Sequence, residues 1–203
     1  MDWAGAVVVA IGGGPSLTHE QVDYCRGRAK IIAINNAVDL APWADLLYFC
    51  DERWYRWHEE TVRRFEGRRV TMENEGLLAE LPGLTCMKND TKRTGEREGF
   101  CESPDGLRTG GNGGYQVLQL AAHLGARRVV LLGYDMRPID GKAHWHEEHP
   151  IPTPLDCLTG YADGFRTLVE PLRRRGVEVI NATPGSALDF FPRATLQEAL
   201  CPA

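Results

Sequence analysis

The densest group of chemically active side chains in this sequence is His144-Trp-His-Glu-Glu-His149, with three imidazoles and two carboxylates in six residues. Histidine titrates near neutral pH and can remove a proton from a hydroxyl when a neighbouring group orients its second nitrogen. His144, His146 and His149 are therefore candidates for a general base, with Asp135 as a nearby acidic candidate. A zinc site would need further ligands. A solvent-exposed polar loop is the other interpretation.

A glycine-rich turn, Gly12-Gly-Gly-Pro-Ser16, follows an apolar run and precedes a helical pattern. Backbone N–H groups in that position can face an anion such as a phosphate, and they lie next to a helix N-terminus that carries partial positive charge. Gly12, Gly13, Gly14 and Ser16 are thus candidate nucleotide contacts. The turn lacks both the Walker A lysine and the third glycine of G-x-G-x-x-G, so NAD chemistry has little support. The competing interpretation is a tight turn that needs glycine for its geometry alone.

A second glycine-rich turn, Thr109-Gly-Gly-Asn-Gly-Gly114, also leads into a helical pattern. It offers a permissive backbone that a ligand can approach closely, which makes Asn112, Gly113 and Gly114 candidate contacts. A flexible linker is the alternative interpretation. Two such turns in one small sheet are more specific than either alone.

Polar side chains follow three of the apolar runs at the point where each ends. Asn35 and Asn36 follow one run, Asp51 follows another, and Asp135 and Arg137 follow a third. A carboxylate in this position can hold Mg²⁺ or bind a ribose, or it can simply cap a helix. Arg137 would supply one positive charge near a phosphate.

Strands and helices alternate along the chain, which predicts an α/β fold, a Rossmann-like parallel sheet flanked by helices. The predicted strands are Ala6–Ile11, Lys30–Ile34, Leu46–Cys50, Val129–Leu132 and Val177–Asn181, with weaker signals at Val70–Met72 and Leu84–Met87. The predicted helices are Gln21–Arg26 with Ser16 or Thr18 as its cap, Arg53–Phe65, Gly113–Gly125, Leu155–Arg175 and Ala194–Leu200. Residues 88–106 lack periodicity and predict an ordered or mobile surface loop; a mobile one could close over a site.

The 203 residues of the chain predict one domain over 1–203. A formal net charge of −5 gives no sign of nucleic acid or of an anionic membrane as a partner. No apolar run approaches the roughly 20 residues that span a bilayer, and the N-terminus does not have the pattern of a signal peptide. Six scattered cysteines without a CxxC pair indicate reduced thiols, so we expect a cytoplasmic protein.

Several motifs, taken in order from Val7 to Leu188, resemble one Rossmann-like superfamily. They are Gly12-Gly-Gly-Pro-Ser-Leu17, Ile34-Asn-Asn36, the strand ending at Asp51, Gly113-Gly-Tyr115, Leu120-Ala-Ala-His-Leu-Gly125 and Leu131-Leu-Gly-Tyr-Asp135. The superfamily joins 6-hydroxymethylpterin diphosphokinase-like proteins, motility-accessory-factor flagellin glycosyltransferases and small bacterial sialyltransferases. With His144-Trp-His and Thr183-Pro-Gly-Ser-Ala-Leu188 included, the sequence is most similar to uncharacterised phage and prophage members, which implies a phage-encoded protein in a host cytoplasm.

The resemblance implies a nucleotide-dependent transferase. Its sialyltransferase branch implies a CMP-sugar donor and a glycan or small-molecule acceptor, with Gly13, Gly14 and Ser16 around the phosphate and Asn35 on the nucleotide. It also implies a histidine base after the Gly-Tyr-Asp strand, His149 by its distance to the next helix and otherwise His146 or His144. The diphosphokinase-like branch implies ATP as donor and Asp51 as a ligand of Mg²⁺.

The sequence departs from the sialyltransferase pattern at several points. Asn112-Gly113 stands where that branch has a Thr-Ser pair, and Arg137 stands where it has a tyrosine. The membrane-associating C-terminal extension of that branch is not present in this sequence. A glycosyltransferase is therefore the first hypothesis, a magnesium-dependent diphosphokinase the second and a non-catalytic nucleotide-binding phage protein the third. A homo-oligomer is compatible with each.

Overall fold

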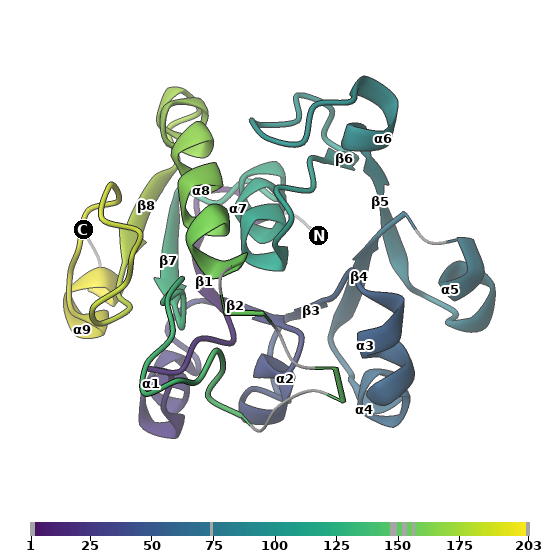
Figure 1. Ribbon diagram of the computed structural model, residues 1–203, viewed down its shortest axis with the longest axis horizontal. Coiled ribbons are helices and arrows are strands. Elements are labelled where there is room, and N and C mark those ends of the chain that lie inside the picture. Colours follow the sequence, from purple (N-terminus) through teal and green to yellow (C-terminus); the bar gives the residue numbers. More distant parts are fainter. Residues whose placement is uncertain (1–2, 74, 147–149, 152–153, 156, 202–203) are drawn as a thin grey trace.

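One parallel eight-stranded sheet forms the centre of the protein (Figure 1). The structure, a computed structural model, describes residues 3–73, 75–146, 150–151, 154–155 and 157–201. The strands are β1 (Val7–Ile11), β2 (Lys30–Ile34), β3 (Leu46–Tyr48), β4 (Arg68–Met72), β5 (Thr85–Asn89), β6 (Gly106–Leu107), β7 (Arg128–Leu132) and β8 (Glu178–Asn181). Their order across the sheet is β6-β5-β4-β3-β2-β1-β7-β8. The predicted Rossmann-like α/β fold is confirmed.

Helices cover both faces of the sheet. They are α1 (His19–Cys25), α2 (Ala37–Leu40), α3 (Glu52–Trp57), α4 (Glu59–Arg64), α5 (Glu75–Glu80), α6 (Asp90–Thr94), α7 (Gly113–His123), α8 (Cys157–Arg174) and α9 (Leu196–Leu200). In Figure 1, α7 and α8 lie on one side of the strands, and α1, α2, α3 and α4 lie on the other. No helix among the described residues combines the length and apolar character needed to cross a bilayer.

Side chains of the central strands alternate between two apolar cores, as the period of a strand requires. Val8 and Leu131 belong to the core under α7 and α8, together with Tyr115 and Phe165. Their chain neighbours, such as Val9, belong to the core under α1, α2, α3 and α9. Burial on both faces explains why these strands appear in the sequence as continuous apolar runs.

The strand order reverses between β1 and β7. Strands β2 to β6 extend from one side of β1, and β7 and β8 extend from the other. The register places Ala10 beside Leu131 on one side and Ile32 on the other, so the three strands end at the same level. Ligands of open α/β sheets bind at such a switch point, outside the carboxyl ends of the strands.

Local details differ from the sequence prediction in places. The helix predicted over Arg53–Phe65 is two helices that meet at His58, and Thr18, not Ser16, caps α1. The short helices α2 and α5 were not predicted. All six cysteines are free thiols, and burial raises the pKa of the Cys25 thiol to about 12.

The segment predicted as a loop over residues 88–106 contains α6 and contributes residues to β5 and β6. Its polar groups bond to distant parts of the chain. The Gly99 N–H donates to the Tyr115 hydroxyl at 2.6 Å, and the Cys101 N–H donates to Gln119 Oε1 at 3.1 Å. The segment thus extends the sheet edge beside α7. Residues 95–105 are irregular, as predicted for a loop, whereas the short helix α6 was not predicted.

Candidate functional site

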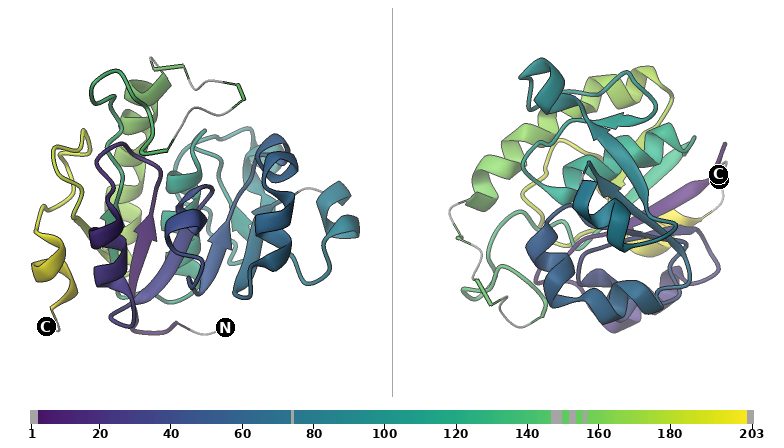
Figure 2. Two further views of the ribbon diagram at one scale, coloured as in Figure 1. Left: turned by 90° about the horizontal axis from the view of Figure 1, so that it is seen from below. Right: turned by 90° about the vertical axis from the view of Figure 1, so that its right-hand side faces the viewer.

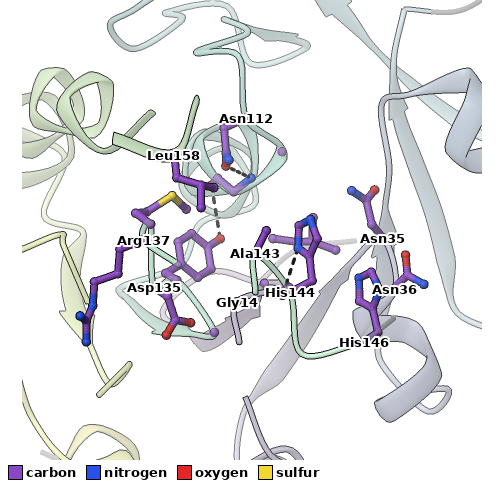
Figure 3. Close-up of a pocket in the computed structure, with 18 residues that line it drawn as sticks. Gly14, Asn35, Asn36, Asn112, Asp135, Arg137, Ala143, His144, His146 and Leu158 are labelled. Atoms are coloured by element: carbon purple, nitrogen blue, oxygen red, sulfur yellow. Dashed lines mark hydrogen bonds between the residues drawn. The ribbon is translucent and has the colours of Figure 1, made fainter. Parts of the chain in front are cut away.

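A pocket of about 120 Å³ lies at the carboxyl ends of β1, β2 and β7, where the strand order reverses (Figure 3). Twelve of the sequence-predicted site residues line it: Gly12, Gly13, Gly14, Asn35, Asn36, Asn112, Gly113, Gly114, Asp135, Arg137, His144 and His146. They come from five segments of the chain, four of which follow strands β1, β2 and β7 or begin α7. The common edge of the parallel strands brings them together.

The first glycine turn is shaped by its neighbour strand β7. Gly12 and Gly14 donate their N–H groups to the carbonyls of Leu132 and Gly133, both at 2.8 Å. A Cβ on Gly12 would lie 2.6 Å from the Gly133 oxygen, so this position tolerates only glycine. The N–H groups of Gly12 and Gly14, which were expected to bind an anion, therefore already donate to carbonyls of the protein. Gly13 also lines the pocket, and among the described residues no backbone carbonyl accepts from its N–H.

Asn112 closes the second glycine turn by capping α7. Its Oδ1 accepts from the N–H groups of Gly114 at 2.7 Å and Tyr115 at 3.3 Å. Gly114 must be small because a Cβ there would lie 2.7 Å from the Tyr134 ring. The Asn112 side chain thus accepts from the N–H groups of Gly114 and Tyr115 but not from that of Gly113. The N–H of Gly113 and the side-chain amide of Asn112 are the donors that remain at the start of α7.

The two asparagines after β2 are held differently. Asn35 has a φ of 51°, a conformation that asparagine adopts more readily than most residues, and its Oδ1 is buried without a hydrogen-bond partner among the described residues. Asn36 is fixed by the Trp54 indole, which donates to its Oδ1 at 2.7 Å, and by His58 at 3.5 Å. Asn36 is thus positioned, and Asn35 offers an acceptor for a ligand.

The Asp135 carboxyl group is 1% exposed and packs directly on the first glycine turn. A Cβ on Gly14 would lie 1.9 Å from Asp135 Oδ2. Burial raises the pKa of this carboxyl, and the nearby Ser16 hydroxyl and backbone N–H partly offset the rise. Neither carboxyl oxygen, nor the Ser16 hydroxyl, has a hydrogen-bond partner among the described residues. Ser16, which was expected to touch the phosphate, therefore faces Asp135 and is not part of the pocket lining. An ionised Asp135 would repel a phosphate at this turn, whereas a protonated one could donate to it.

The histidine loop is anchored to the same turn. His144 Nδ1 lies 3.3 Å from the Gly13 carbonyl oxygen, which also accepts from the Trp145 N–H at 3.2 Å. The His144 and His146 rings stack, with centroids 4.9 Å apart and planes within 5°. His149 lies outside the described residues. Two of the three candidate bases thus belong to the pocket.

Arg137 stands at the rim of the pocket. Its Nε donates to the Gly185 carbonyl at 2.6 Å, and its guanidinium points away from the two histidines in Figure 3. This exposed side chain would have to leave Gly185 to reach a phosphate in the pocket.

Asp51 does not line the pocket. Its carboxylate caps α3 and binds Arg53, which holds the pKa of Asp51 below its usual range. Within the described residues no three His, Cys, Asp or Glu side chains are close enough to share a metal ion. Asp51 in this arrangement is a poor fit to the predicted Mg²⁺ ligand, since its oxygens are already paired.

Several contributors were not among the predicted site residues. His58 and Trp54 position Asn36, and Trp145 packs its ring into the core below the histidine loop. The sequence around Asn36 contains no local signal for the aromatic residues that hold its side chain. The remaining pocket residues are Ile34, Gly133, Tyr134, Met136, Ala143 and Leu158.

Comparison with known proteins does not add to this description. No protein-family profile matches the chain, and no curated protein matches it.

Proposed function

We propose that this protein is a nucleotide-dependent transferase that moves a sugar from a CMP-type donor to a hydroxyl acceptor. The observation that carries the proposal is that both glycine turns, Asn35 and two histidines line one pocket at the switch point of a parallel sheet. Anion donors and a general base are the two components that such a transfer needs.

The donor phosphate fits best between the two glycine turns. The N–H groups of Gly13 and Gly113 and the amide of Asn112 would be the donors there, and the N-terminus of α7, which carries the positive end of the helix dipole, belongs to the same pocket. The buried oxygen of Asn35 would accept from an amino or hydroxyl group of the nucleotide. These groups would stabilise the charge that grows on the phosphate as the sugar leaves.

His144 is the best-placed base. A carbonyl oxygen can only accept, so Nδ1 of His144 must carry the proton that it shares with Gly13. In the neutral ring Nε2 is then the nitrogen that can take a proton. It would take the acceptor hydroxyl proton while the acceptor oxygen bonds to the anomeric carbon. The bond from that carbon to the phosphate oxygen breaks, and its electron pair leaves with the nucleotide.

The other two hypotheses have less support. Magnesium-dependent transfer from ATP was expected to use Asp51, whose carboxylate is paired with Arg53 outside the pocket. A module that only binds nucleotide would not need an imidazole oriented by a backbone carbonyl.

The test is nucleotide release from CMP-sugar donors in the presence of hydroxyl acceptors, with and without EDTA. We expect donor-dependent CMP release that EDTA leaves unchanged. His144→Ala should lower it about 100-fold or more, the usual contribution of a general base. His19→Ala, on the exposed start of α1, is the matched control. Full activity of both His144→Ala and His146→Ala would refute this mechanism, and release only with ATP and Mg²⁺ would favour the diphosphokinase.

A further inference from the structure

A groove lies at the end of the sheet opposite the pocket, at the amino ends of β1 and β2. It is lined by Arg26, Arg28, Lys30, Trp43 and Asp45, with backbone from β1, and has a volume of about 640 Å³. Figure 2 shows the amino ends of the strands and the described N-terminal residues at one end, and the 136–146 loop at the other. The groove is therefore separate from the candidate active site.

Further arginines flank this groove on both sides. Ala6, which lines the groove, accepts from the backbone N–H of Arg127 at 3.0 Å, and Asp45 accepts at its backbone oxygen from the N–H of Arg68 at 3.0 Å. Arg68 begins β4 and Arg127 precedes β7, four strands away. At about 4.8 Å per strand, the arginines form a row of about 19 Å along the sheet edge.

The row is positive although the chain as a whole is negative. Its cations are Arg26, Arg28, Lys30, Arg68 and Arg127, and the carboxylates near them in the sequence are Asp23, Asp45 and Glu66. Arg69 and Arg128 are bonded elsewhere, Arg69 to the Pro82 carbonyl and Arg128 to Glu178 and the carbonyls of Ala199 and Cys201. Asp45 pairs with Lys30, and Glu178 pairs with Arg128. A net charge summed over the chain hides such a local excess.

Two of the arginines are stacked on aromatic rings. The Arg26 guanidinium lies 5.3 Å from the centroid of Trp43, and that of Arg28 lies 4.3 Å from the centroid of Tyr24. The ring contact restricts each guanidinium, and Arg28 Nη1 also donates to the Tyr24 carbonyl at 2.7 Å, so the other N–H groups are those that a phosphate could use. Aromatic and guanidinium planes are also surfaces on which unpaired bases stack. An acidic peptide would use the charges alone, so stacked planes in a positive row favour a nucleic acid.

We propose that this row, which we call the amino-edge groove, binds a single strand of nucleic acid through its phosphate backbone. Binding would be largely independent of sequence, because the groove offers cations and ring faces. This inference does not depend on the proposed function, since the groove and the pocket lie at opposite ends of the sheet. A strand bound in this groove would be held at the opposite end of the sheet from the pocket.

The test is the anisotropy of a fluorescein-labelled oligothymidine of about twenty residues, titrated with the full-length protein at several salt concentrations. The triple variant Arg26→Gln, Arg28→Gln, Arg127→Gln removes three exposed cations of the groove. Its control, Arg53→Gln, Arg63→Gln, Arg64→Gln, removes three exposed arginines of α3 and α4 and changes the net charge equally.

We expect binding that weakens as salt rises, and a slope of log K against log salt that falls by about 2 in the groove variant, at about 0.7 per lost phosphate contact on a single strand. The control variant should keep the wild-type slope, and saturating CMP, which competes only for the pocket, should not displace the strand. The proposal is overturned by no binding at low salt, by equal losses in both variants, or by a labelled polyglutamate that binds as tightly with the same dependence on the groove.

Discussion

Gly14 is the position at which the packing of the site can be tested most sharply, by the single substitution Gly14→Ala. The added Cβ would lie 1.9 Å from Asp135 Oδ2 and 2.7 Å from the Gly133 carbonyl oxygen. Both distances are far below van der Waals contact, so either the carboxyl or the backbone must move. Gly14 has no positive φ, so the cost comes from this contact and not from backbone strain.

The size of the effect follows from the burial of Asp135. Asp135 is 1% exposed, so its carboxyl has little room to move away from the added methyl group unless the turn or β7 shifts as well. Overpacking of this kind costs about 1–3 kcal/mol, and the contact with a backbone oxygen favours the upper end, about 3 kcal/mol. For a chain of this length that corresponds to a fall in Tm of about 6–12 °C.

Thermal denaturation followed by circular dichroism measures this directly. Gly160→Ala is the matched control, because Gly160 lies in α8 with nothing within 4 Å of its added Cβ. That change should leave Tm unchanged or raise it, since alanine is the better helix former by up to about 1 kcal/mol.

A second-site change separates the two contacts of the added methyl group. Asp135→Ala in the Gly14→Ala background removes the carboxyl but not the Gly133 oxygen, so part of the lost stability should return. We expect the two changes to be non-additive by at least about 1 kcal/mol. A Gly14→Ala variant as stable as wild type, or strict additivity with Asp135→Ala, would refute the close packing of Asp135 on this turn.

Three further predictions concern stability. Burial raises the pKa of Asp135, so ionisation of this carboxyl in the folded state lowers stability as pH rises. Asp135→Asn should therefore be more stable than wild type at pH 8 and lose that advantage as pH falls to the unfolded pKa of about 3.9. A Tm difference that is constant with pH would contradict this. Asp90→Asn removes a buried carboxylate whose pKa is lowered by neighbouring arginines, including Arg108. The variant should lose about 2 kcal/mol of unfolding free energy in urea at pH 7, and progressively less below about pH 4. An unchanged urea midpoint at pH 7 would disprove this. Tyr48→Phe removes the 2.7 Å bond to Gln116 Oε1 and should cost about 1–2 kcal/mol, so a variant with wild-type stability would show that this buried bond contributes nothing.

The central sheet was predictable because its strands are buried on both faces. Continuous apolar runs such as that of β7 are typical of strands buried on both faces of a parallel sheet, and the carboxyl-end rule then brings together the polar residues that follow them. The same rule accounts for the meeting of the glycine turns, Asn35 and His144 in one pocket. The short helix α2 was missed because four residues carry no helical period.

The contacts that refine the site depend on pairs of residues far apart in the chain. Position 14 requires glycine because a Cβ there would clash with Asp135, and Trp54 orients the side chain of Asn36. Neither pairing is visible in the local sequence. The segment over 88–106 appeared irregular because its polar groups bond to side chains of α7, such as Gln119. A polar stretch whose partners lie elsewhere in the chain has the same composition as a mobile loop.

The most direct test of a nucleotide site in this pocket is the shift in Tm of the purified protein with cytidine, uridine, guanosine and adenosine nucleotides, each with Mg²⁺ and with EDTA. A nucleotide at a hundred times its Kd should add about 2.7 kcal/mol, which is about 5–11 °C for a chain of this size. We predict a shift with CMP or CDP that EDTA does not abolish. No shift with any nucleotide would contradict the assignment of the two glycine turns to a phosphate.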